Sequence, residues 1–228
     1  MRIAVIIPAL NEQESIPQVV AELPRDLVQE VIVVDNGSTD QTAQVAKAAG
    51  ARVVHQPQRG YGYACAAGAA AAQPEADVLV FMDGDGSDDG SQVQTLIEPI
   101  ESGQADLVLG SRVLGPAARE ALLPHQRLGN SLTTALIRLL YRRRITDLPP
   151  FKAIRRPILD ELHMREMTYG WTVEMIVKCA RLDHRIVEIP ATARSRIGGV
   201  SKVSGTLKGT IMAAYYMLGT TIKYAWRN

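Results

Sequence analysis

The chain has 228 residues, of which 46% are hydrophobic and 21% are charged. This length and balance exclude an intrinsically disordered chain and allow one large domain with a full hydrophobic core. The two cysteines form neither a disulfide framework nor a metal-ligand spacing, and no signal-peptide pattern follows the first methionine, so we expect a reducing, cytoplasmic compartment.

The formal net charge of +1 hides a strong asymmetry between the two halves of the chain. Residues 1–110 contain 5 Lys or Arg and 16 Asp or Glu, whereas residues 111–228 contain 20 and 8. The acidic half could therefore hold a metal ion, and the basic half could hold phosphates or an anionic surface. The alternative interpretation, that basic helices simply cover an acidic sheet, stays equally open.

Apolar runs alternate with helical patterns throughout the first half. The pattern predicts strands at residues 2–7, 30–35, 51–55, 77–82 and 106–109, and helices at about 11–23, 38–49, 62–73 and 91–102. This strict alternation with short connections predicts an α/β fold with a mainly parallel sheet and helices on both faces. The strand ends at Pro8, Asp35 and Asp83 should then face one crevice, which is where such sheets bind ligands.

The second half is more helical. A helix is predicted at about 124–141, with five leucines on one face, namely Leu128, Leu132, Leu136, Leu139 and Leu140. A helix near 170–182, a strand at 185–189 and a basic, glycine-containing loop at 194–204 follow. The last apolar segment has an uncharged core of only 14 residues, fewer than the roughly 20 that span a bilayer. We therefore expect a main domain at 1–205 and a helix at 206–228 that is packed or lies at a membrane interface.

Asp83 and Asp85 stand one residue apart, directly after the predicted strand at 77–82. Packing explains them poorly, because neighbouring carboxylates repel each other and lose hydration on burial unless a cation lies between them. Gly84 lets the backbone turn sharply between the two. Carboxylate oxygens at this end of a strand suit Mg²⁺ or Mn²⁺ bound to a diphosphate. A solvated acidic turn is the alternative interpretation.

Five motifs carry a family resemblance. They are Pro-Ala-Leu-Asn-Glu at 8–12, Val-Val-Asp-Asn-Gly-Ser-Thr-Asp at 33–40, Met-Asp-Gly-Asp at 82–85, Gly-Ser-Arg at 110–112 and Arg-Ile-Gly-Gly-Val-Ser-Lys at 196–202. The first three, in this order, resemble family 2 glycosyltransferases. With the last two, the chain resembles the dolichyl-phosphate mannose synthase branch over about residues 1–205. The resemblance implies a GT-A fold.

The resemblance also implies a nucleotide-sugar site at the sheet edge. The residues that it assigns to nucleotide-sugar binding are Pro8, Asn11, Glu12, Asp35, Arg59, Gly60, Asp83 and Gly84. It implies that Asp83 and Asp85 hold the divalent cation, and Ser87 stands where members of the branch often have a third ligand. The chain departs from the family pattern at Asn36, where family members have an aspartate.

Further residues acquire roles by the same resemblance. Asp85, Arg196 and Lys202 are implied to act on the departing diphosphate, and Arg112, Arg127 and Ser131 to bind the acceptor phosphate. Guanidinium groups suit this because they bind phosphate oxygens in a bidentate manner. Residues 147–152, Asp-Leu-Pro-Pro-Phe-Lys, occupy the place of the branch's Asp-x-Ser-Gly-Phe-Arg element, where the prolines should stiffen the acceptor side. Glu174 matches a helix carboxylate with a supporting role.

Together these features predict an inverting, metal-dependent glycosyltransferase that moves a sugar from a nucleotide-diphosphate donor to a polyprenyl-phosphate-type lipid. An anionic acceptor oxygen requires no general base. One alternative is a hydroxyl acceptor on a lipid or soluble glycan, with Asp88, Asp89 or Asp147 as the base. Another is a catalytically silent nucleotide-sugar binding module. We expect no nucleic-acid partner, and a cytoplasmic protein with possible peripheral binding to the cytoplasmic membrane face.

Overall fold

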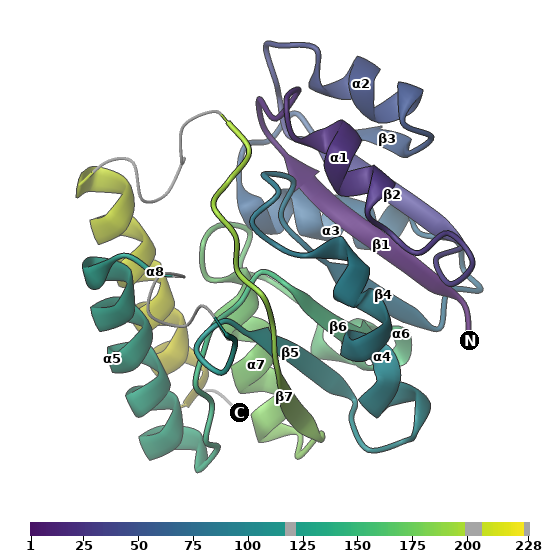
Figure 1. Ribbon diagram of the computed structural model, residues 1–228. Coiled ribbons are helices and arrows are strands. Elements are labelled where there is room, and N and C mark those ends of the chain that lie inside the picture. The colour runs from purple at the N-terminus through teal and green to yellow at the C-terminus, as the bar shows by residue number, and fades with distance from the viewer. Residues whose placement is uncertain (117–121, 199–206, 226–228) are drawn as a thin grey trace.

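The computed structural model describes residues 1–116, 122–198 and 207–225. A seven-stranded sheet in the order β3-β2-β1-β4-β6-β5-β7 runs through the molecule (Figure 1). The strands are β1 (Ile3–Ala9), β2 (Glu30–Asp35), β3 (Arg52–His55), β4 (Val78–Phe81), β5 (Leu107–Ser111), β6 (Lys152–Arg155) and β7 (Ile186–Pro190). Every neighbouring pair is parallel except those that include β6, which is antiparallel to both β4 and β5. The expected α/β architecture with a mainly parallel sheet is therefore confirmed.

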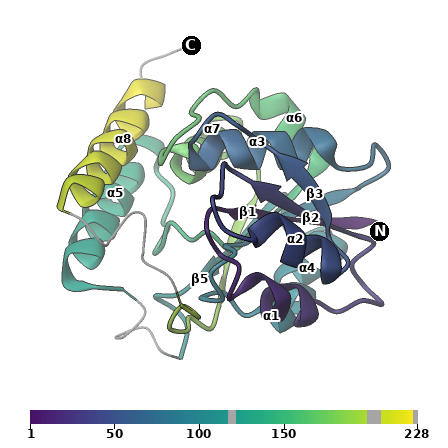
Figure 2. The same cartoon turned by 90° about the horizontal axis from the view of Figure 1, so that it is seen from above.

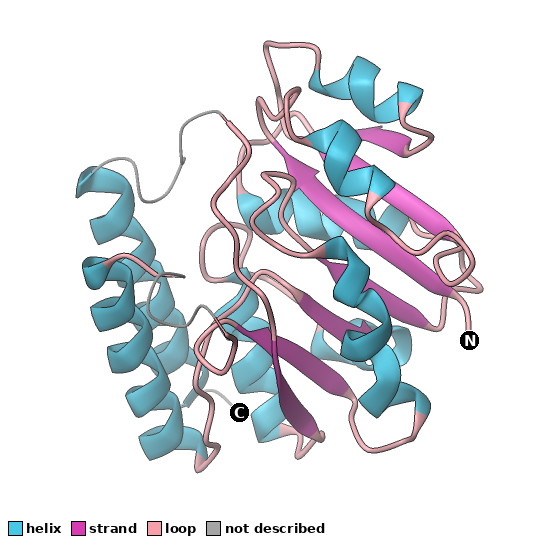
Figure 3. Cartoon of the chain, viewed as in Figure 1, coloured by secondary structure: helices cyan, strands magenta, loops and turns pink. Residues whose placement is uncertain are grey.

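Helices cover both faces of this sheet, as expected (Figures 2 and 3). The helices are α1 (Ile16–Ala21), α2 (Thr42–Ala48), α3 (Tyr61–Ala71), α4 (Val93–Glu101), α5 (Pro124–Tyr141), α6 (Arg156–Leu162), α7 (Trp171–Arg181) and α8 (Leu207–Ala225), with a short 3-10 turn at Gly90–Gln92. Helices α1, α2 and α4 lie on one face, and α3, α6 and α7 lie on the other. Helices α5 and α8 lie side by side beyond one edge of the sheet.

The core follows from the alternation of side chains along each strand. In β1, Ile3, Val5 and Ile7 pack with α1, α2 and α4, whereas Ala4 and Ile6 pack with α3 and α7. All five side chains are at most 1% exposed. A strand that is buried on both faces needs apolar residues at every position, which explains the unbroken apolar runs in the sequence.

The strand β6 was not predicted; it lies in the second half of the chain, between α5 and α6. The chain leaves β5 at the carboxyl edge of the sheet, forms α5, and re-enters the sheet from that same edge. It must therefore run antiparallel to its neighbours. Its register pairs Lys152 with Phe81, the last residue of β4. This register places a lysine next to Asp83. The prediction that Pro8 closes the first strand was also wrong, since β1 continues to Ala9.

The leucine face predicted for α5 does not form a core face. Leu128, Leu132 and Leu139 are 62%, 52% and 75% exposed, whereas Thr133 and Ile137 are buried. The buried stripe of α5 is thus the one that meets α7 and α8. None of the described helices is long and apolar enough to cross a membrane.

A buried carboxylate anchors α8. Glu174 on α7 is completely buried and accepts hydrogen bonds from the backbone N–H groups of Arg165 and Glu166 and from the hydroxyl of Tyr224 on α8. The Nζ of Lys178 lies 2.7 Å from the same carboxylate. Every lone pair that burial removes from water is thereby compensated. Glu174 lies among structural contacts, so its role is to hold the loop at 163–170 and α8 together.

Two helix glycines provide a test of this packing. A Cβ at Gly68 in α3 would overlap Ile6 of β1, whereas a Cβ at Gly129 in α5 would meet nothing within 4 Å. We expect Gly68→Ala to lower the free energy of unfolding by about 1–3 kcal/mol through overpacking. Gly129→Ala should raise it by up to about 1 kcal/mol, because alanine loses less backbone entropy. Urea denaturation of both variants measures the difference, and equal effects would contradict the close packing of α3 on β1.

Candidate active site

The candidate site lies along the carboxyl edge of β1, β2 and β4, where these parallel strands end side by side (Figure 1). The turn after β1 ties the other two loops together. The N–H of Asn11 donates to Ser38 Oγ at 3.0 Å, and the hydroxyl of Ser15 donates to the carbonyl of Gly84 at 2.7 Å. Asn11 has a φ of 54°, a left-handed conformation that asparagine tolerates better than most residues. Three motifs that are far apart in the sequence therefore share one edge.

Asp35 ends β2 and is only 8% exposed. One of its carboxylate oxygens accepts a hydrogen bond from the N–H of Ser38 at 2.9 Å. The other lies 3.2 Å from His55 Nδ1 at the end of β3. Asp35, which the resemblance assigns to nucleotide-sugar binding, is thus held in a fixed orientation at the rim of the sheet.

Asn36 holds the loop that connects β3 to α3. Its Nδ2 donates to the carbonyls of Gln56 and Gln58 at 2.9 and 2.7 Å, and its Oδ1 accepts from the N–H of Gly60 at 2.8 Å. An ionised aspartate cannot donate, so it would place a negative charge against two carbonyl oxygens. Asn36, where the family pattern has an aspartate, therefore suits the two carbonyl acceptors of this loop. The sequence alone gave no sign of these partners.

Arg59 and Gly60 lie in the loop that Asn36 holds. The Nη2 of Arg59 donates to the carbonyl of Gly37 at 3.1 Å, so the guanidinium lies against the loop after β2. Gly60 has a φ of 153°, and a Cβ there would lie 2.6 Å from the carbonyl oxygen of Met167. Only glycine fits, because the loop that contains Met167 packs directly on this turn.

Asp83, Asp85 and Asp88 follow β4 within one tight loop. The N–H of Asp83 donates to Asp88 Oδ2 at 2.9 Å, and the N–H of Ser87 donates to Asp85 Oδ1 at 2.9 Å. Ser87 therefore orients Asp85 through its backbone. Asp88 is 4% exposed, and its carboxylate fixes the backbone of Asp83.

Burial and neighbouring negative charge raise the pKa values of Asp83 and Asp88. Burial raises the pKa of Asp83 well above its usual value, the charges of Asp85 and Asp88 raise it further, and the cations Lys152 and Arg112 oppose the shift. Burial also raises the pKa of Asp88, to about 6, although the hydrogen bond from the Asp83 backbone stabilises its charged form. Such a cluster is unfavourable unless more positive charge arrives.

The carboxylate oxygens of this loop fit a metal cation that takes its remaining coordinating atoms from a bound ligand. Within the ranges 1–116, 122–198 and 207–225, no three His, Cys, Asp or Glu side chains are grouped so that they could hold a metal ion. Mg²⁺ and its close analogue Mn²⁺ commonly take one or two protein carboxylates and fill their remaining positions with phosphate oxygens and water. Asp83 and Asp85 would supply such a pair, and burial, followed by the charges of Asp85 and Asp88, raises the pKa of Asp83.

Arg196 faces the carboxylates from the segment that follows β7. Its Nη2 lies 2.9 Å from one oxygen of Glu12, and its Nη1 lies 3.7 Å from Asp85. The N–H of Ile197 donates to the carbonyl of Asp85 at 2.8 Å, and a Cβ at Gly86, which has a φ of 77°, would overlap Ile197. The segment therefore lies directly on the Asp83–Asp88 loop. Lys202, the other predicted cation of this segment, lies outside the described residues.

Lys152 is a site residue that was not assigned a role from the sequence. It is completely buried, and its Nζ donates to the carbonyl of Pro150 at 2.9 Å. Burial lowers its pKa, while Cys65 and the carboxylates of Asp83 and Asp88 act in the opposite direction. The only available signal was its place in the 147–152 element, and its approach to Asp83 depends on the antiparallel register of β6.

Arg112 forms a bidentate ion pair with Asp147. Its Nε and Nη2 each lie 2.9 Å from a carboxylate oxygen of Asp147, and its backbone N–H donates to the same group at 2.9 Å. Asp147 is completely buried, and it also accepts from the N–H of Leu148 at 2.8 Å. Burial lowers the pKa of Arg112, but the hydrogen bonds and charge of Asp147 outweigh this and raise it overall. The Nε–Nη2 edge of the guanidinium is thus used within the protein.

Arg127 and Ser131 lie four residues apart on α5, and both are exposed. They come from the outer helix layer, whereas Arg112 directly follows the sheet. The structure therefore brings Pro8, Asn11, Glu12, Asp35, Asp83, Gly84, Asp85, Ser87 and Arg196 to one sheet edge, with Arg59 and Gly60 beside it. Arg127 and Ser131 are on a separate element, the outer helix α5.

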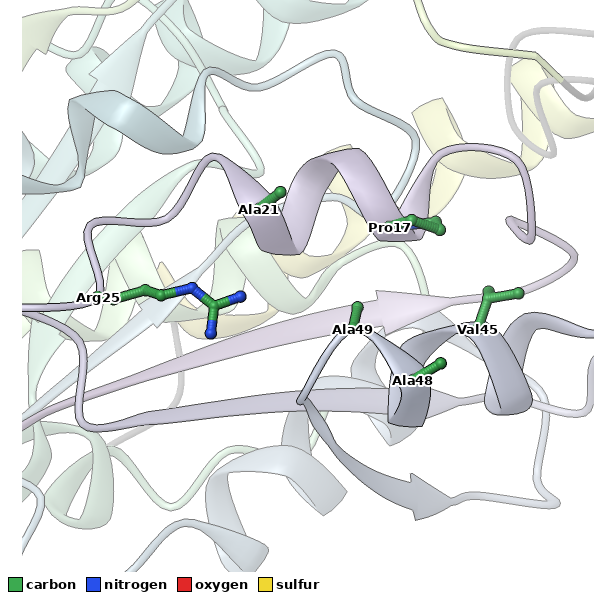
Figure 4. Close-up of a pocket in the computed structure, with 6 residues that line it drawn as sticks. All are labelled: Pro17, Ala21, Arg25, Val45, Ala48 and Ala49. Carbon is green, nitrogen blue, oxygen red and sulfur yellow. The ribbon is translucent and has the colours of Figure 1, made fainter.

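Two hollows in the surface can be compared with the positions of the predicted site residues. A hollow of about 150 Å³ at the sheet edge is lined by Asn11, Glu12, Gln13, Glu14, Asp40 and Gly198, and so includes two of the predicted residues. A groove of about 350 Å³ between α1 and α2 is lined by Pro17, Ala21, Arg25, Val45, Ala48 and Ala49 (Figure 4). The groove contains none of the predicted residues and only one charged side chain, so it is not part of the site.

The family comparison agrees with the geometry. Residues 4–163 match the model described as glycosyl transferase family 2. The chain belongs to this family and is a glycosyltransferase. It is 37% identical over 211 residues to an uncharacterized glycosyltransferase of Mycobacterium tuberculosis, which covers 92% of this chain and 94% of that protein.

A relative with a named activity is also similar. The undecaprenyl-phosphate mannosyltransferase of Micrococcus luteus is 36% identical over 223 residues, covering 92% of this chain and 90% of the relative. Among solved structures, glucosyl-3-phosphoglycerate synthase from M. tuberculosis in complex with Mn²⁺, UDP and phosphoglyceric acid has a TM-score of 0.77 at 24% identity, covering 100% and 79% of the two chains. Its complex with Mn²⁺, UDP-glucose and phosphoglyceric acid has a TM-score of 0.73 at 26% identity, covering 96% and 79%. The expected GT-A fold is thereby confirmed.

The carboxylate cluster makes stability depend on pH in a definite direction. Because the pKa of Asp88 rises to about 6 and that of Asp83 rises further, the folded chain binds more protons than the unfolded chain above a pH of about 4. The melting temperature of the protein in EDTA should therefore fall as the pH rises from 4 through 6. Thermal melts at a series of pH values measure this slope, and Asp88→Asn should flatten it. A slope that stays the same in Asp88→Asn would contradict the assignment.

Asn36→Asp tests the loop between β3 and α3. The variant should lose about 1–3 kcal/mol of stability, because the carbonyls of Gln56 and Gln58 lose their donor and face a negative charge instead. Its defect should lessen at low pH, since a protonated carboxyl can donate one hydrogen bond again. Chemical denaturation at two pH values measures both effects. Gln58→Ala keeps the carbonyl that Asn36 contacts and serves as the matched control, with an expected change within about 0.5 kcal/mol.

Proposed function

We propose that this glycosyltransferase is inverting and metal-dependent, and that it transfers a hexose from a nucleotide-diphosphate sugar to a polyprenyl phosphate. The observation that carries the proposal is the cluster of Asp83, Asp85 and Asp88 at the end of β4, faced by Arg196. These carboxylates concentrate negative charge where a donor diphosphate and its cation would bind. The guanidinium of Arg196 lies 3.7 Å from Asp85.

The donor end of the proposal rests on the carboxylates and on the solved relatives. Asp83 and Asp85 would hold Mg²⁺ or Mn²⁺, with Ser87 in support, and a bound cation would neutralise charge on the departing diphosphate. Arg196 is held by Glu12 at 2.9 Å and so is already oriented toward Asp85. A preorganised cation of this kind stabilises developing negative charge without reorganisation. The structural relative binds Mn²⁺ together with UDP-glucose, which supports a cation and nucleotide sugar here.

Asp35, Asn11 and Arg59 would form the nucleotide end of the site. Asp35 is fixed by Ser38 and lies beside the end of β3, and Asn11 ties the β1 turn to the same loop. Pro8, Glu12, Gly60 and Gly84 complete the surface. Each of these residues has a backbone or side-chain contact that sets its position before any ligand binds, which lowers the entropy lost on binding.

The acceptor end favours an anion. Arg127 and Ser131 offer donors on the exposed side of α5, and Arg112 adds positive charge near Asp83 and Asp88. A phosphate oxygen is already negative at neutral pH, so it can attack the anomeric carbon from the face opposite the leaving group without losing a proton. Relatives named for polyprenyl-phosphate chemistry support this acceptor class.

A hydroxyl acceptor would need a carboxylate base, and the three candidates are occupied. Asp147 is buried and bound by Arg112, Asp88 accepts from the Asp83 backbone, and Asp89 lies 2.6 Å from Arg194. Bases in these environments are poorly placed to take a proton from an acceptor. The polyprenyl-phosphate proposal is therefore the better supported of the two.

The test is transfer of labelled hexose from GDP-, UDP- and dTDP-sugars to undecaprenyl phosphate in detergent, with Mn²⁺ or with EDTA. We expect a metal-dependent, acid-labile lipid product. Asp85→Asn should lower kcat/KM by roughly 100-fold or more, since the loss of several kcal/mol of charge stabilisation corresponds to that factor. Asp26→Asn, at an exposed position, is the matched control and should retain full activity.

The outcomes separate the alternatives. An alkali- and acid-stable glycoside as the product would favour the hydroxyl acceptor. Binding of a nucleotide sugar, seen as a thermal shift, with no transfer to any acceptor would favour the silent binding module. Equal activity of Asp85→Asn and the parent protein would overturn the proposed role of the carboxylates.

A further inference from the structure

The outer surface of α5 carries an apolar stripe that the core does not use. Leu128, Leu132 and Leu139 are all more than half exposed, and Ala135 between them is exposed as well. These positions follow the spacing i, i+4, i+7 and i+11, so they form one continuous line along the helix. Single surface leucines are ordinary, but an aligned row marks a surface that meets another apolar phase.

The same helix and the segment that directly follows it are together strongly basic. Residues 122–146 contain five arginines and no Asp or Glu, and residues 207–225, which form α8, contain two lysines and no acid. Arg143 pairs with Asp183. Arg127, Arg138, Arg142 and Arg144 are exposed, and no ion pair is found for them within the described part of the chain. Positive charge therefore flanks the leucine row without internal compensation.

Helix α8 extends this layer. It packs beside α5 and stands apart from the sheet (Figures 1 and 2). Its buried residues include Thr220, Thr221 and Tyr224, whereas Tyr215 and Ile222 are 71% and 49% exposed. The helix is therefore anchored on one side and apolar on the other. Both helices of the layer expose apolar side chains together with cations.

We propose that the outer face of α5, extended by α8, binds the surface of an anionic lipid bilayer, with Leu128, Leu132 and Leu139 inserted among the acyl chains. The arginines beside them match negatively charged head groups. Where the proposed function holds, this orientation also serves it, because Arg127 and Ser131 are next to Leu128 and Leu132 and would meet a lipid phosphate at the membrane surface.

The charge pattern distinguishes a bilayer from a second copy of the chain. A symmetric contact through α5 would place the same surface against itself and bring two rows of uncompensated arginines together. A bilayer that contains anionic lipid instead supplies the opposite charge along the whole helix. Each arginine near such a surface contributes on the order of 1 kcal/mol, which is roughly a fivefold change in partition.

The experiment is flotation with vesicles of phosphatidylglycerol and phosphatidylcholine, and with vesicles of phosphatidylcholine alone. We expect binding to the anionic vesicles that weakens with added salt. The triple variant Leu128→Gln, Leu132→Gln and Leu139→Gln should bind at least about tenfold more weakly, since it removes three inserted apolar side chains. Leu182→Gln, at a 50% exposed leucine outside the α5–α8 layer, is the matched control and should bind like the parent.

The double variant Arg138→Gln and Arg142→Gln gives an independent readout. It should lose the preference for anionic vesicles while keeping the melting temperature of the parent. Unchanged flotation of the triple variant would overturn the proposal. A dimer seen by light scattering and abolished in the triple variant would also overturn it, because a second copy would then cover the leucine row.

The test is separable from that of the enzymatic proposal. Vesicle binding without any sugar transfer would support the membrane-binding proposal and contradict the proposed polyprenyl-phosphate acceptor. Sugar transfer to undecaprenyl phosphate in detergent, together with no binding to anionic vesicles, would support the proposed acceptor and contradict the membrane-binding proposal.

Discussion

Repulsion among three carboxylates at the end of β4 is the constraint around which the site is arranged. Asp83, Asp85 and Asp88 are held within one loop, and burial strengthens their mutual repulsion because water screens it less. Cations approach from three separate parts of the chain. Lys152 enters from β6, and Arg196 comes from the segment after β7. Arg112 adds a third charge from the end of β5. The divalent cation proposed for this site would add positive charge to the cluster.

The rest of the edge is rigid because its loops satisfy one another. The turn after β1 is bonded to the loops after β2 and β4, and Asn36 fastens the β3–α3 connection through three hydrogen bonds. Met167, on a loop held by the buried Glu174, closes the same connection from the other side. Glu174 also anchors α8 through Tyr224. One buried carboxylate therefore stabilises both the nucleotide side of the site and the outer helix layer, so the two regions share structural support without sharing ligands.

Sequence reasoning succeeded where local pattern and long-range geometry coincide. The apolar runs of β1, β2 and β4 are unambiguous because each strand is buried on both faces, and parallel strands must end at a common edge. The convergence of Pro8, Asp35 and Asp83 followed from that rule alone. Sequence reasoning failed where contacts with other parts of the chain decide which side of a helix is buried. The leucines of α5 have a helical spacing that fits a core equally well as a surface, and only the packing of α5 on α7 and α8 selects Thr133 and Ile137 as its buried side.

The sequence by itself determined the order of strands and helices in the first half, the family, and the carboxylate pair at the sheet edge, because each depends on residues that are close together in the chain. Tertiary structure alone decided the direction of β6 and the burial of Lys152 beside Asp83. It also decided that Asp147 is held by Arg112 and that Asn36 must donate two hydrogen bonds. These features depend on contacts between segments tens of residues apart, and no spacing within one segment encodes where another segment will lie.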